Sequence, residues 1–411
     1  MSIAEAPQVS MLKNLPTILW DMKENHLADL IEALTAWVRI ILGEAPLPLP
    51  PPRIVEIHPA GKGLCPFKCK WCTGKNLRHK GLRRTPLRAI LDVIRKARQN
   101  GVRFITLSGI YSEPLTHKKI HEIMCHLRKS GVAFGLHSKF YLATPPVIDA
   151  LTSAPNAKYC AVSFDYFNEG HYAAALGTSE RAWAISKGNI EALVKTAHDR
   201  SSSLEISIRT LIAPPNSVSQ LSGMADWMRD LRARHPRAKL NWRLSFPWTS
   251  TPKPGETAAD FDPSIHFPAA EKKDIAEWID QILQVSADWP GRGNVSFRKN
   301  EGALRTTEKR ACFYSLLFTA LGVSGRAYAC QGCATPEYDH LSYCDLTPDG
   351  HDFYDAFRSR PRSAICAPAA SHKCPGCAAP TEAAVNSAAA NLAYELLGVD
   401  VREDCVKTRF D

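Results

Sequence analysis

Short apolar runs alternate with amphipathic stretches between residues 53 and about 250. The apolar runs have the length and the β-branched or aromatic content of strands, and they cover 53–58, 103–108, 132–137, 159–164, 204–212 and 240–246. The stretches between them carry apolar residues at helical spacing, and they cover 85–101, 116–131, 144–154, 180–199 and 218–235. Strands that alternate with helices build a parallel sheet with the helices outside it. The pattern therefore predicts an α/β fold, closed or partly closed as a barrel.

The chain divides into three parts at changes in this pattern. Residues 1–52 combine an amphipathic stretch at 26–44, which predicts a helix packed on the body rather than on a membrane, with the stiff linker APLPLPPP. Residues 53–300 hold the barrel and end in a loop and a helix over 269–287. Residues 301–411 are rich in Cys, Gly and Pro and show little periodicity, so we expect a small module that a metal staples together.

Composition narrows the class of protein. With 45% hydrophobic and 22% charged residues and no long apolar run, we expect a soluble globular protein without a membrane span. The start of the sequence lacks the basic and apolar regions of a secretory signal, which favours a cytoplasmic location. The net charge of +10 favours acidic partners, without choosing among nucleic acid, phosphorylated substrates, acidic peptides and acidic electron carriers.

The thirteen cysteines fall into two groups. One group lies on a single short segment at 65–72, and the other lies between 312 and 405. A long chain without an export signal rarely uses a disulfide scaffold, so these thiols are candidate metal ligands or nucleophiles. The two remaining cysteines, Cys125 and Cys160, lie in helix and strand patterns and fit buried apolar positions.

The first group has the spacing C-x3-C-x2-C, in the sequence GLCPFKCKWC directly after the first predicted strand. Its thiols, Cys65, Cys69 and Cys72, can hold three irons of a [4Fe–4S] cluster and leave the fourth iron open for another ligand. A zinc loop is the alternative, but it needs a fourth ligand, for which only His58 and His79 lie nearby.

This loop resembles the hallmark of the radical S-adenosylmethionine (AdoMet, or SAM) enzymes, which carry C-x3-C-x-aromatic-C after the first strand of a partial (β/α)6 TIM-like barrel. The resemblance implies that AdoMet chelates the open iron and that Trp71 packs near its adenine. It further implies reductive cleavage of AdoMet to a 5′-deoxyadenosyl radical, which abstracts a hydrogen atom from the substrate. The chain is thereby expected to be an enzyme, a radical SAM oxidoreductase or maturase.

Further residues match this family at the predicted strand ends. Gly109 and Glu113 remain from the family's G-G-E-P segment, although LSGIYSEP departs from it, and Glu113 would receive the ammonium of AdoMet. Ser163 and Asp165 resemble an S-x-D segment with ribose or substrate contacts, or they cap an ordinary loop. Arg209 would pair with the AdoMet carboxylate, or it forms a structural salt bridge. Other polar side chains are expected at the same mouth, namely His137, Ser138, Lys139, Arg243 and Ser245.

The second cysteine group resembles the twitch and SPASM extensions of this family. Cys312 and Cys330 flank Gly325, which would allow a hairpin, and the later pair Cys374 and Cys377 completes four ligands for one auxiliary [4Fe–4S] cluster. Other cysteines leave alternatives open: a second auxiliary cluster using Cys333, Cys344 and Cys366, or hydrogen-atom donation by Cys333, Cys344 or Cys405. Zinc, or no metal, is the remaining alternative for this module.

The resemblance implies modification of a ribosomally made peptide (a RiPP), by crosslinking, epimerisation or excision. The alternative is a dehydrogenase or epimerase of a sugar, aminocyclitol or other small molecule in natural-product biosynthesis. Residues 1–52 are too few for a leader-binding domain, so either a separate leader-peptide-binding partner or leader binding by another surface of the protein is expected. The basic run at 75–84 is either an ordinary solvated loop or a positive rim that docks a reduced flavodoxin, a ferredoxin or an anionic substrate. No aromatic-interleaved motif supports nucleic acid. A zinc-stapled binding protein without catalysis is the hypothesis from another class.

Overall fold

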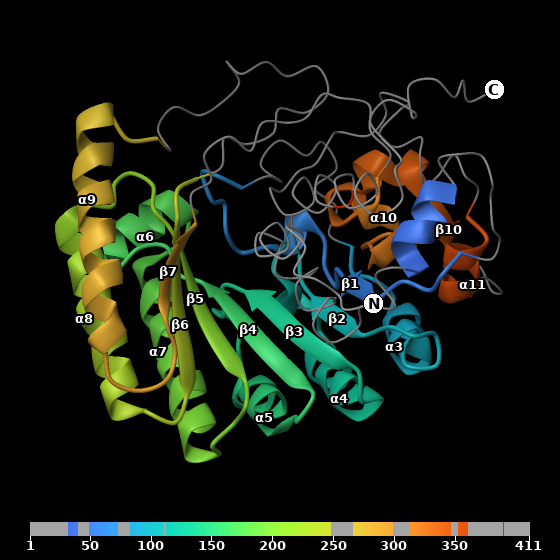
Figure 1. The fold of residues 1–411 in the computed structure, drawn as a ribbon, viewed down its shortest axis with the longest axis horizontal. Coiled ribbons are helices and arrows are strands. Elements are labelled where there is room, and N and C mark those ends of the chain that lie inside the picture. The colour runs from blue at the N-terminus through green and yellow to red at the C-terminus, as the bar shows by residue number, and fades with distance from the viewer. Residues whose placement is uncertain are drawn as a thin grey trace, which may run out of the picture.

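A computed structural model describes residues 32–39, 49–72, 83–109, 112–247, 266–298, 312–346, 352–360 and 389. Its centre is one ten-stranded sheet in the order β10-β9-β8-β1-β2-β3-β4-β5-β6-β7 (Figure 1). The strands are β1 Ile54–Ile57, β2 Phe104–Leu107, β3 Ala133–Ser138, β4 Ala157–Ser163, β5 Glu205–Leu211, β6 Lys239–Ser245, β7 Val295–Arg298, β8 Phe318–Leu321, β9 Arg326–Tyr328 and β10 Ser342–Asp345. Strands β1 to β7 are parallel to their neighbours, β8 is parallel to β1, and the last two pairings are antiparallel.

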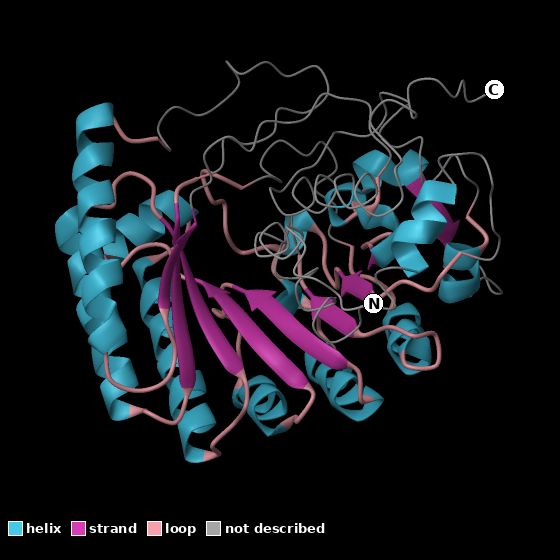
Figure 2. Cartoon of the chain, viewed as in Figure 1, coloured by secondary structure: helices cyan, strands magenta, loops and turns pink. Residues whose placement is uncertain are grey.

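Helices line the outer face of the curved sheet (Figure 2). They are α3 Leu87–Ala97, α4 Ile120–Ser130, α5 Pro145–Ser153, α6 Glu169–Leu176, α7 Glu180–Asp199, α8 Val218–Arg234 and α9 Ala269–Val285, with α10 Tyr314–Leu317 and α11 Phe353–Arg358 in the C-terminal part. In α3 the buried positions Ile90, Val93, Ile94 and Ala97 follow the helical period, which is why this segment folds as a helix against the sheet. The described helices are each too short or too polar to cross a bilayer.

The predicted fold class is confirmed, and the six predicted strands correspond to β1–β6. The second predicted helix ends at residue 131, where Gly131 caps α4 in the left-handed conformation. The structure differs from the prediction after residue 250. Helix α9 leads into β7, and this strand extends the sheet beside β6. Helix α6 was also not predicted. Its eight residues form only about two helical turns, too few to show a helical repeat.

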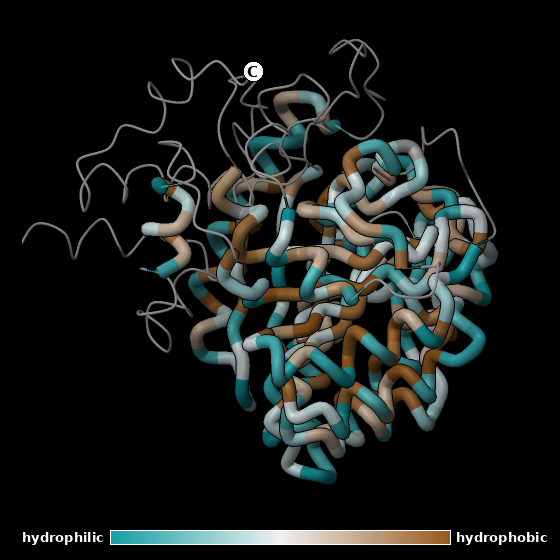
Figure 3. Tube along the Cα trace, turned by 90° about the vertical axis from the view of Figure 1, so that its right-hand side faces the viewer, coloured by the Kyte–Doolittle hydropathy of each residue, from teal (hydrophilic) through white to brown (hydrophobic). Residues whose placement is uncertain are grey.

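The apolar core has two parts, and hydrophobic positions gather in the middle of the molecule (Figure 3). The larger part lies between the sheet and its outer helices. The smaller part joins the short helix at 32–39, through Trp37, to Phe313, to β8 and to the β9 residue Tyr328. The C-terminal segment therefore continues the barrel sheet and shares a core with the N-terminal helix.

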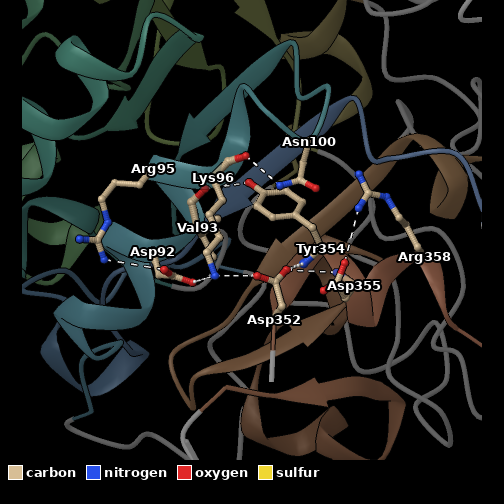
Figure 4. A network of polar contacts seen from close by, with 9 residues as sticks. All are labelled: Asp92, Val93, Arg95, Lys96, Asn100, Asp352, Tyr354, Asp355 and Arg358. Atoms are coloured by element: carbon tan, nitrogen blue, oxygen red, sulfur yellow. Dashed lines mark hydrogen bonds and ion pairs between the residues drawn. The ribbon is translucent and has the colours of Figure 1, made fainter. Parts of the chain in front are cut away.

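A polar network ties α11 to the outer helix α3 (Figure 4). Lys96 on α3 forms ion pairs with Asp92 at 3.1 Å and with Asp352 at 2.6 Å, and Asp352 also caps α11 by accepting from the Tyr354 amide. The buried Tyr354 hydroxyl donates to the Val93 carbonyl at 2.8 Å. The network fixes the C-terminal segment against the first helix of the barrel.

Replacing Tyr354 by Phe should lower the free energy of unfolding by about 1 kcal/mol, because the buried hydrogen bond to Val93 is lost. Lys96→Met serves as the matched change, since its ion pairs are partly exposed and screened by salt. Urea unfolding followed by circular dichroism, at low salt and at about 1 M salt, measures both variants. The Tyr354→Phe loss should persist at high salt while any Lys96→Met loss disappears, and a salt-dependent Tyr354→Phe effect would contradict this assignment.

Candidate functional site

The carboxyl ends of β1 to β5 meet at one edge of the sheet, and the segment with Cys65, Cys69 and Cys72 follows β1 there. This loop is held by its own backbone, since the amides of Lys68 and Lys70 donate to the carbonyls of the last residues of α6 at 2.7 and 3.1 Å. The buried ring of Phe67 anchors it in the apolar core. The loop is therefore held in a fixed position at the carboxyl edge of the barrel.

The three thiols differ in their surroundings. Cys69 is 8% exposed, and burial raises the pKa of its thiol to about 12, opposed by the positive charge of Lys139. Cys65 and Cys72 are half-buried, and burial also raises the pKa of Cys65. The Lys62 ammonium donates to the Cys72 sulfur at 3.2 Å.

Among the described residues, no three His, Cys, Asp or Glu side chains converge as a site for one metal ion. The donor set itself fits an iron–sulfur cluster, because three thiolates on one loop bind three irons and leave the fourth open. Two lysines near these sulfurs, Lys62 and Lys139, supply positive charge that favours thiolates over thiols. The three cysteines thus remain the predicted ligands of the cluster.

Gly109 begins a tight turn after β2 that delivers Glu113 to the same edge. A Cβ at Gly109 would lie 2.5 Å from the Ser112 hydroxyl oxygen and 2.7 Å from its carbonyl oxygen, so only glycine fits without displacing this turn. The Ser112 hydroxyl donates to the carbonyl of Ala60, which joins the turn to the segment after β1.

The Glu113 carboxylate is 2% exposed and already has three donors. Oε1 accepts from the Ser138 hydroxyl at 2.6 Å and from the Leu115 amide at 3.2 Å, and Oε2 accepts from the Lys139 amide at 2.8 Å. Burial raises the pKa of Glu113, and these hydrogen bonds act in the opposite direction. The carboxylate therefore joins the end of β2 to the end of β3, and its binding of the AdoMet ammonium stays a prediction.

The Lys139 side chain contacts two of the predicted residues, Asp165 and Trp71. Its ammonium lies 2.6 Å from Asp165 Oδ2 and 5.9 Å from the centroid of the Trp71 ring. Asp165 is 3% exposed, and its Oδ1 accepts from the Leu211 amide at 3.0 Å, so both carboxylate oxygens have partners. The Trp71 ring also packs 5.7 Å from the Tyr166 ring. The ends of β3, β4 and β5 thus meet beside the cysteine loop.

Arg209 and Ser163 are neighbours in the register of β4 and β5. The Arg209 guanidinium lies 3.2 Å from His137 Nδ1, which must accept this hydrogen bond because arginine only donates. His137 Nε2 then donates to the Tyr159 hydroxyl at 2.7 Å. Burial and the charge of Arg209 lower the pKa of His137 well below its usual value, so the ring is neutral. Binding of the AdoMet carboxylate by Arg209 stays a prediction.

In the C-terminal part, Gly325 has φ of +78° in the turn between β8 and β9, so the predicted hairpin is confirmed. Cys312 and Cys330 are half-buried and pack, with the buried Cys333, in the smaller core. Cys344 belongs to the larger core, and burial raises its pKa to about 11. The predicted ligands Cys374 and Cys377, and also Cys366 and Cys405, lie outside the described residues.

Two contacts at the mouth could not be assigned from the sequence. One is the hydrogen bond from the Lys62 ammonium to the Cys72 sulfur. The other is the ion pair of Lys139 with Asp165, because the predicted strand order places Lys139 at the mouth but does not identify its partner. A lysine three residues before a cysteine motif is a weak signal, because lysine is common in surface loops. Most of the basic run at 75–84 lies outside the described residues, so its docking role is untested.

No protein-family model and no curated protein sequence matches the chain. Solved structures do match. Streptococcus suis SuiB bound to S-adenosylmethionine superposes with a TM-score of 0.52 and 14% identity, over 77% of this chain and 68% of that chain. The same protein bound to its precursor peptide SuiA gives 0.50 and 13%, over 77% and 65%. The protein anSMEcpe with bound AdoMet gives 0.48 and 12%, over 85% and 99%.

The likeness to SuiB concerns the fold, and this chain spans about two thirds of the length of SuiB. The expected partial barrel is present, with the cysteine loop after its first strand. The chain therefore shares the fold of SuiB, a protein that binds S-adenosylmethionine.

Proposed function

We propose that this protein is a radical AdoMet enzyme that removes a hydrogen atom from a peptide substrate. The observation that carries the proposal is the C-x3-C-x2-C loop after β1, in the fold of an AdoMet-binding protein. The competing zinc-staple hypothesis has no explanation for this loop at the carboxyl edge of a parallel sheet, where such folds place their chemistry.

Cys65, Cys69 and Cys72 would hold the [4Fe–4S] cluster, and Trp71, Gly109, Glu113, Ser163, Asp165 and Arg209 would surround AdoMet. A cluster bound there would, once reduced, supply the electron for cleavage of AdoMet to methionine and a 5′-deoxyadenosyl radical, and that radical would take the substrate hydrogen. The chain's own contribution is orientation. Glu113 and Asp165 hold the strand ends together through buried hydrogen bonds.

The C-terminal module would carry one auxiliary [4Fe–4S] cluster on Cys312, Cys330, Cys374 and Cys377. The hairpin at Gly325, which separates the first two of these, supports the proposal. Four thiolates would close this cluster to substrate and suit it to electron transfer. A second auxiliary cluster remains the alternative.

A peptide substrate is supported by SuiB, which binds its precursor peptide SuiA and shares this fold. A sugar, aminocyclitol or other small molecule is the second candidate, because the described residues include no peptide-binding domain beyond the barrel and its C-terminal strands. The reaction also needs an electron donor, for which a reduced flavodoxin or ferredoxin suits the basic chain.

Iron and sulfide content, measured after anaerobic reconstitution, tests the cofactor assignment together with dithionite-dependent formation of 5′-deoxyadenosine. About eight irons per chain with nucleoside formation supports one AdoMet cluster and one auxiliary cluster, and about twelve supports a second auxiliary cluster. About four irons with activity removes the auxiliary cluster alone. Zinc without iron, and no 5′-deoxyadenosine, would overturn the enzyme assignment.

Isotope transfer separates the two substrate classes. The enzyme is incubated with AdoMet and either a peptide library made from perdeuterated amino acids or a panel of perdeuterated sugars and aminocyclitols. Because the 5′-deoxyadenosyl radical takes its hydrogen from the substrate, deuterium appears in 5′-deoxyadenosine only with the correct class. Label from the peptides is expected, and label from the small molecules alone would replace the peptide proposal with its alternative.

A further inference from the structure

The inner face of the sheet at β5 and β6 is polar. On β6 the side chains of Leu240, Trp242 and Leu244 are buried, and the Trp242 ring packs 6.2 Å from the Trp278 ring of the outer helix α9. Because successive side chains of a strand point to opposite faces, Lys239 and Arg243 lie on the inner face. Branched apolar side chains fill the interior of a packed barrel, so this polar face indicates a surface for water or a ligand.

Positive charge exceeds negative charge on this inner face. Strands β5 and β6 together carry three cations, Arg209, Lys239 and Arg243, and one carboxylate, Glu205. Glu205 Oε2 lies 2.8 Å from the Lys239 ammonium, and its Oε1 lies 3.3 Å from the Arg243 guanidinium. The nearby carboxylate of Asp165, at the end of β4, already pairs with Lys139 at 2.6 Å. The face therefore keeps an excess of positive charge for an anionic ligand.

The residues around Arg209 orient this side chain without adding negative charge. Its guanidinium donates to Nδ1 of the neutral His137 ring, whose Nε2 donates to the Tyr159 hydroxyl. Phe104 stacks on the Tyr159 ring at 5.5 Å, and a Cβ at Gly135 would overlap that ring. The hydrogen-bonded chain is therefore held in place from β2 to β5.

Arg243 is the accessible cation of the inner face. It is the register partner of Arg209 on the neighbouring strand, and its side chain is 46% exposed. Among the described residues, its guanidinium donates one hydrogen bond, to Glu205. A guanidinium presents several N–H donors in a planar fork that matches the two oxygens of a carboxylate. Arg243 therefore retains donors with which it can bind an anion.

We propose that Arg243, beside Arg209, binds a carboxylate of the substrate, so that the peptide segment that enters the barrel contains Asp or Glu. The inference rests on the proposed function, because it concerns the substrate of that reaction. Arg209 lies one same-face position before Leu211, whose amide binds Asp165 at the carboxyl edge. The carboxylate site thus lies about 7 Å along the strands from the edge that carries the cysteine loop.

The first test selects ligands from a synthetic library of random peptides. The reconstituted full chain, with AdoMet and without a reductant, is mixed with the library, and the retained peptides are sequenced by mass spectrometry. Peptides with Asp or Glu should be enriched about tenfold over those with Asn or Gln, which have a similar shape without the charge. Equal retention of the charged and the neutral peptides would overturn the proposal.

Variants assign the preference to one side chain. Arg243→Gln should abolish the enrichment of acidic peptides, and Arg243→Glu should reverse it in favour of peptides with Lys or Arg. A purely structural role of Arg243 does not predict such a reversal. Arg229→Gln is the matched control, because Arg229 lies on the outer helix α8 and pairs with Asp226 at 2.7 Å. This control should retain the wild-type preference, and its loss there would contradict the assignment.

Binding of radiolabelled AdoMet is measured on the same proteins by equilibrium dialysis. The affinity for AdoMet should be the same in the wild-type protein and in Arg243→Gln. Weaker AdoMet binding by Arg243→Gln, with an unchanged preference among peptides, would show that Arg243 binds the AdoMet carboxylate and would overturn the proposal.

Turnover identifies the source of the carboxylate. Perdeuterated acidic peptides, sugar acids and neutral sugars are supplied separately, and deuterium is measured in 5′-deoxyadenosine. Label from acidic peptides supports the proposal in full, whereas label from sugar acids but not from neutral sugars supports the carboxylate site and rejects the peptide as its source. Label from neutral sugars or neutral peptides at an equal rate overturns the carboxylate site alone. Protein without iron and without 5′-deoxyadenosine overturns the proposed function itself.

Discussion

Replacing Cys65, Cys69 and Cys72 together by alanine will remove about four iron atoms per chain and all formation of 5′-deoxyadenosine. The three thiols lie on one loop after β1, and the chain offers no second C-x3-C-x2-C segment that could replace them. Without ligands for the cluster, AdoMet has no iron to chelate and no source of the electron. Iron analysis and chromatography of the nucleoside products measure both losses.

The matched control is Cys125→Ala. This cysteine is half-buried on α4, its sulfur lies 3.6 Å from the His121 ring, and nothing links it to the candidate site. Iron content and activity should stay at the wild-type level. Full activity of the triple variant would contradict the cluster assignment. Zinc in place of iron, at the same level in the wild-type protein and the triple variant, would favour the zinc-staple hypothesis.

Replacing Asp165 by alanine should lower the free energy of unfolding by about 3–5 kcal/mol. The change leaves the Lys139 ammonium almost buried without its carboxylate, and it leaves the Leu211 amide without its acceptor. Uncompensated buried charge is among the most costly consequences of a single substitution. Urea unfolding of the iron-free protein, followed by circular dichroism, measures the loss without interference from the cluster.

A second substitution separates charge from packing. Asp165→Ala/Lys139→Met removes both charges, so part of the lost stability should return. Arg200→Met, which breaks an exposed ion pair of the same 2.6 Å length with Asp149, should cost at most about 1 kcal/mol. A loss below about 1 kcal/mol for Asp165→Ala would mean that Lys139 reaches water in solution.

Much of the barrel could be predicted because the sequence patterns of its strands and helices are local. Each of the strands β1–β6 is a short apolar run, and the long helices α7 and α8 have clear amphipathic repeats and lie where the pattern placed them. Strand β7 and the addition of the β8–β9 hairpin to the barrel sheet could not be predicted in the same way. Their pairing with β6 and β1 joins residues far apart in the chain, and no local pattern records such a contact.

The candidate site likewise combines residues that a local sequence pattern predicts with contacts that depend on the tertiary structure. Spacing and residue type alone predict Cys65, Cys69 and Cys72 as cluster ligands, because the ligand chemistry of a cluster is carried by one short segment. The sequence also determined the parallel order of the strands, and with it the edge at which their polar ends meet. Only the tertiary structure decided that Glu113 is bound by the end of β3 and that Lys139 lies between Asp165 and Trp71. Those contacts join residues 26 to 68 positions apart, and their energies depend on burial, which exists only once the chain has folded.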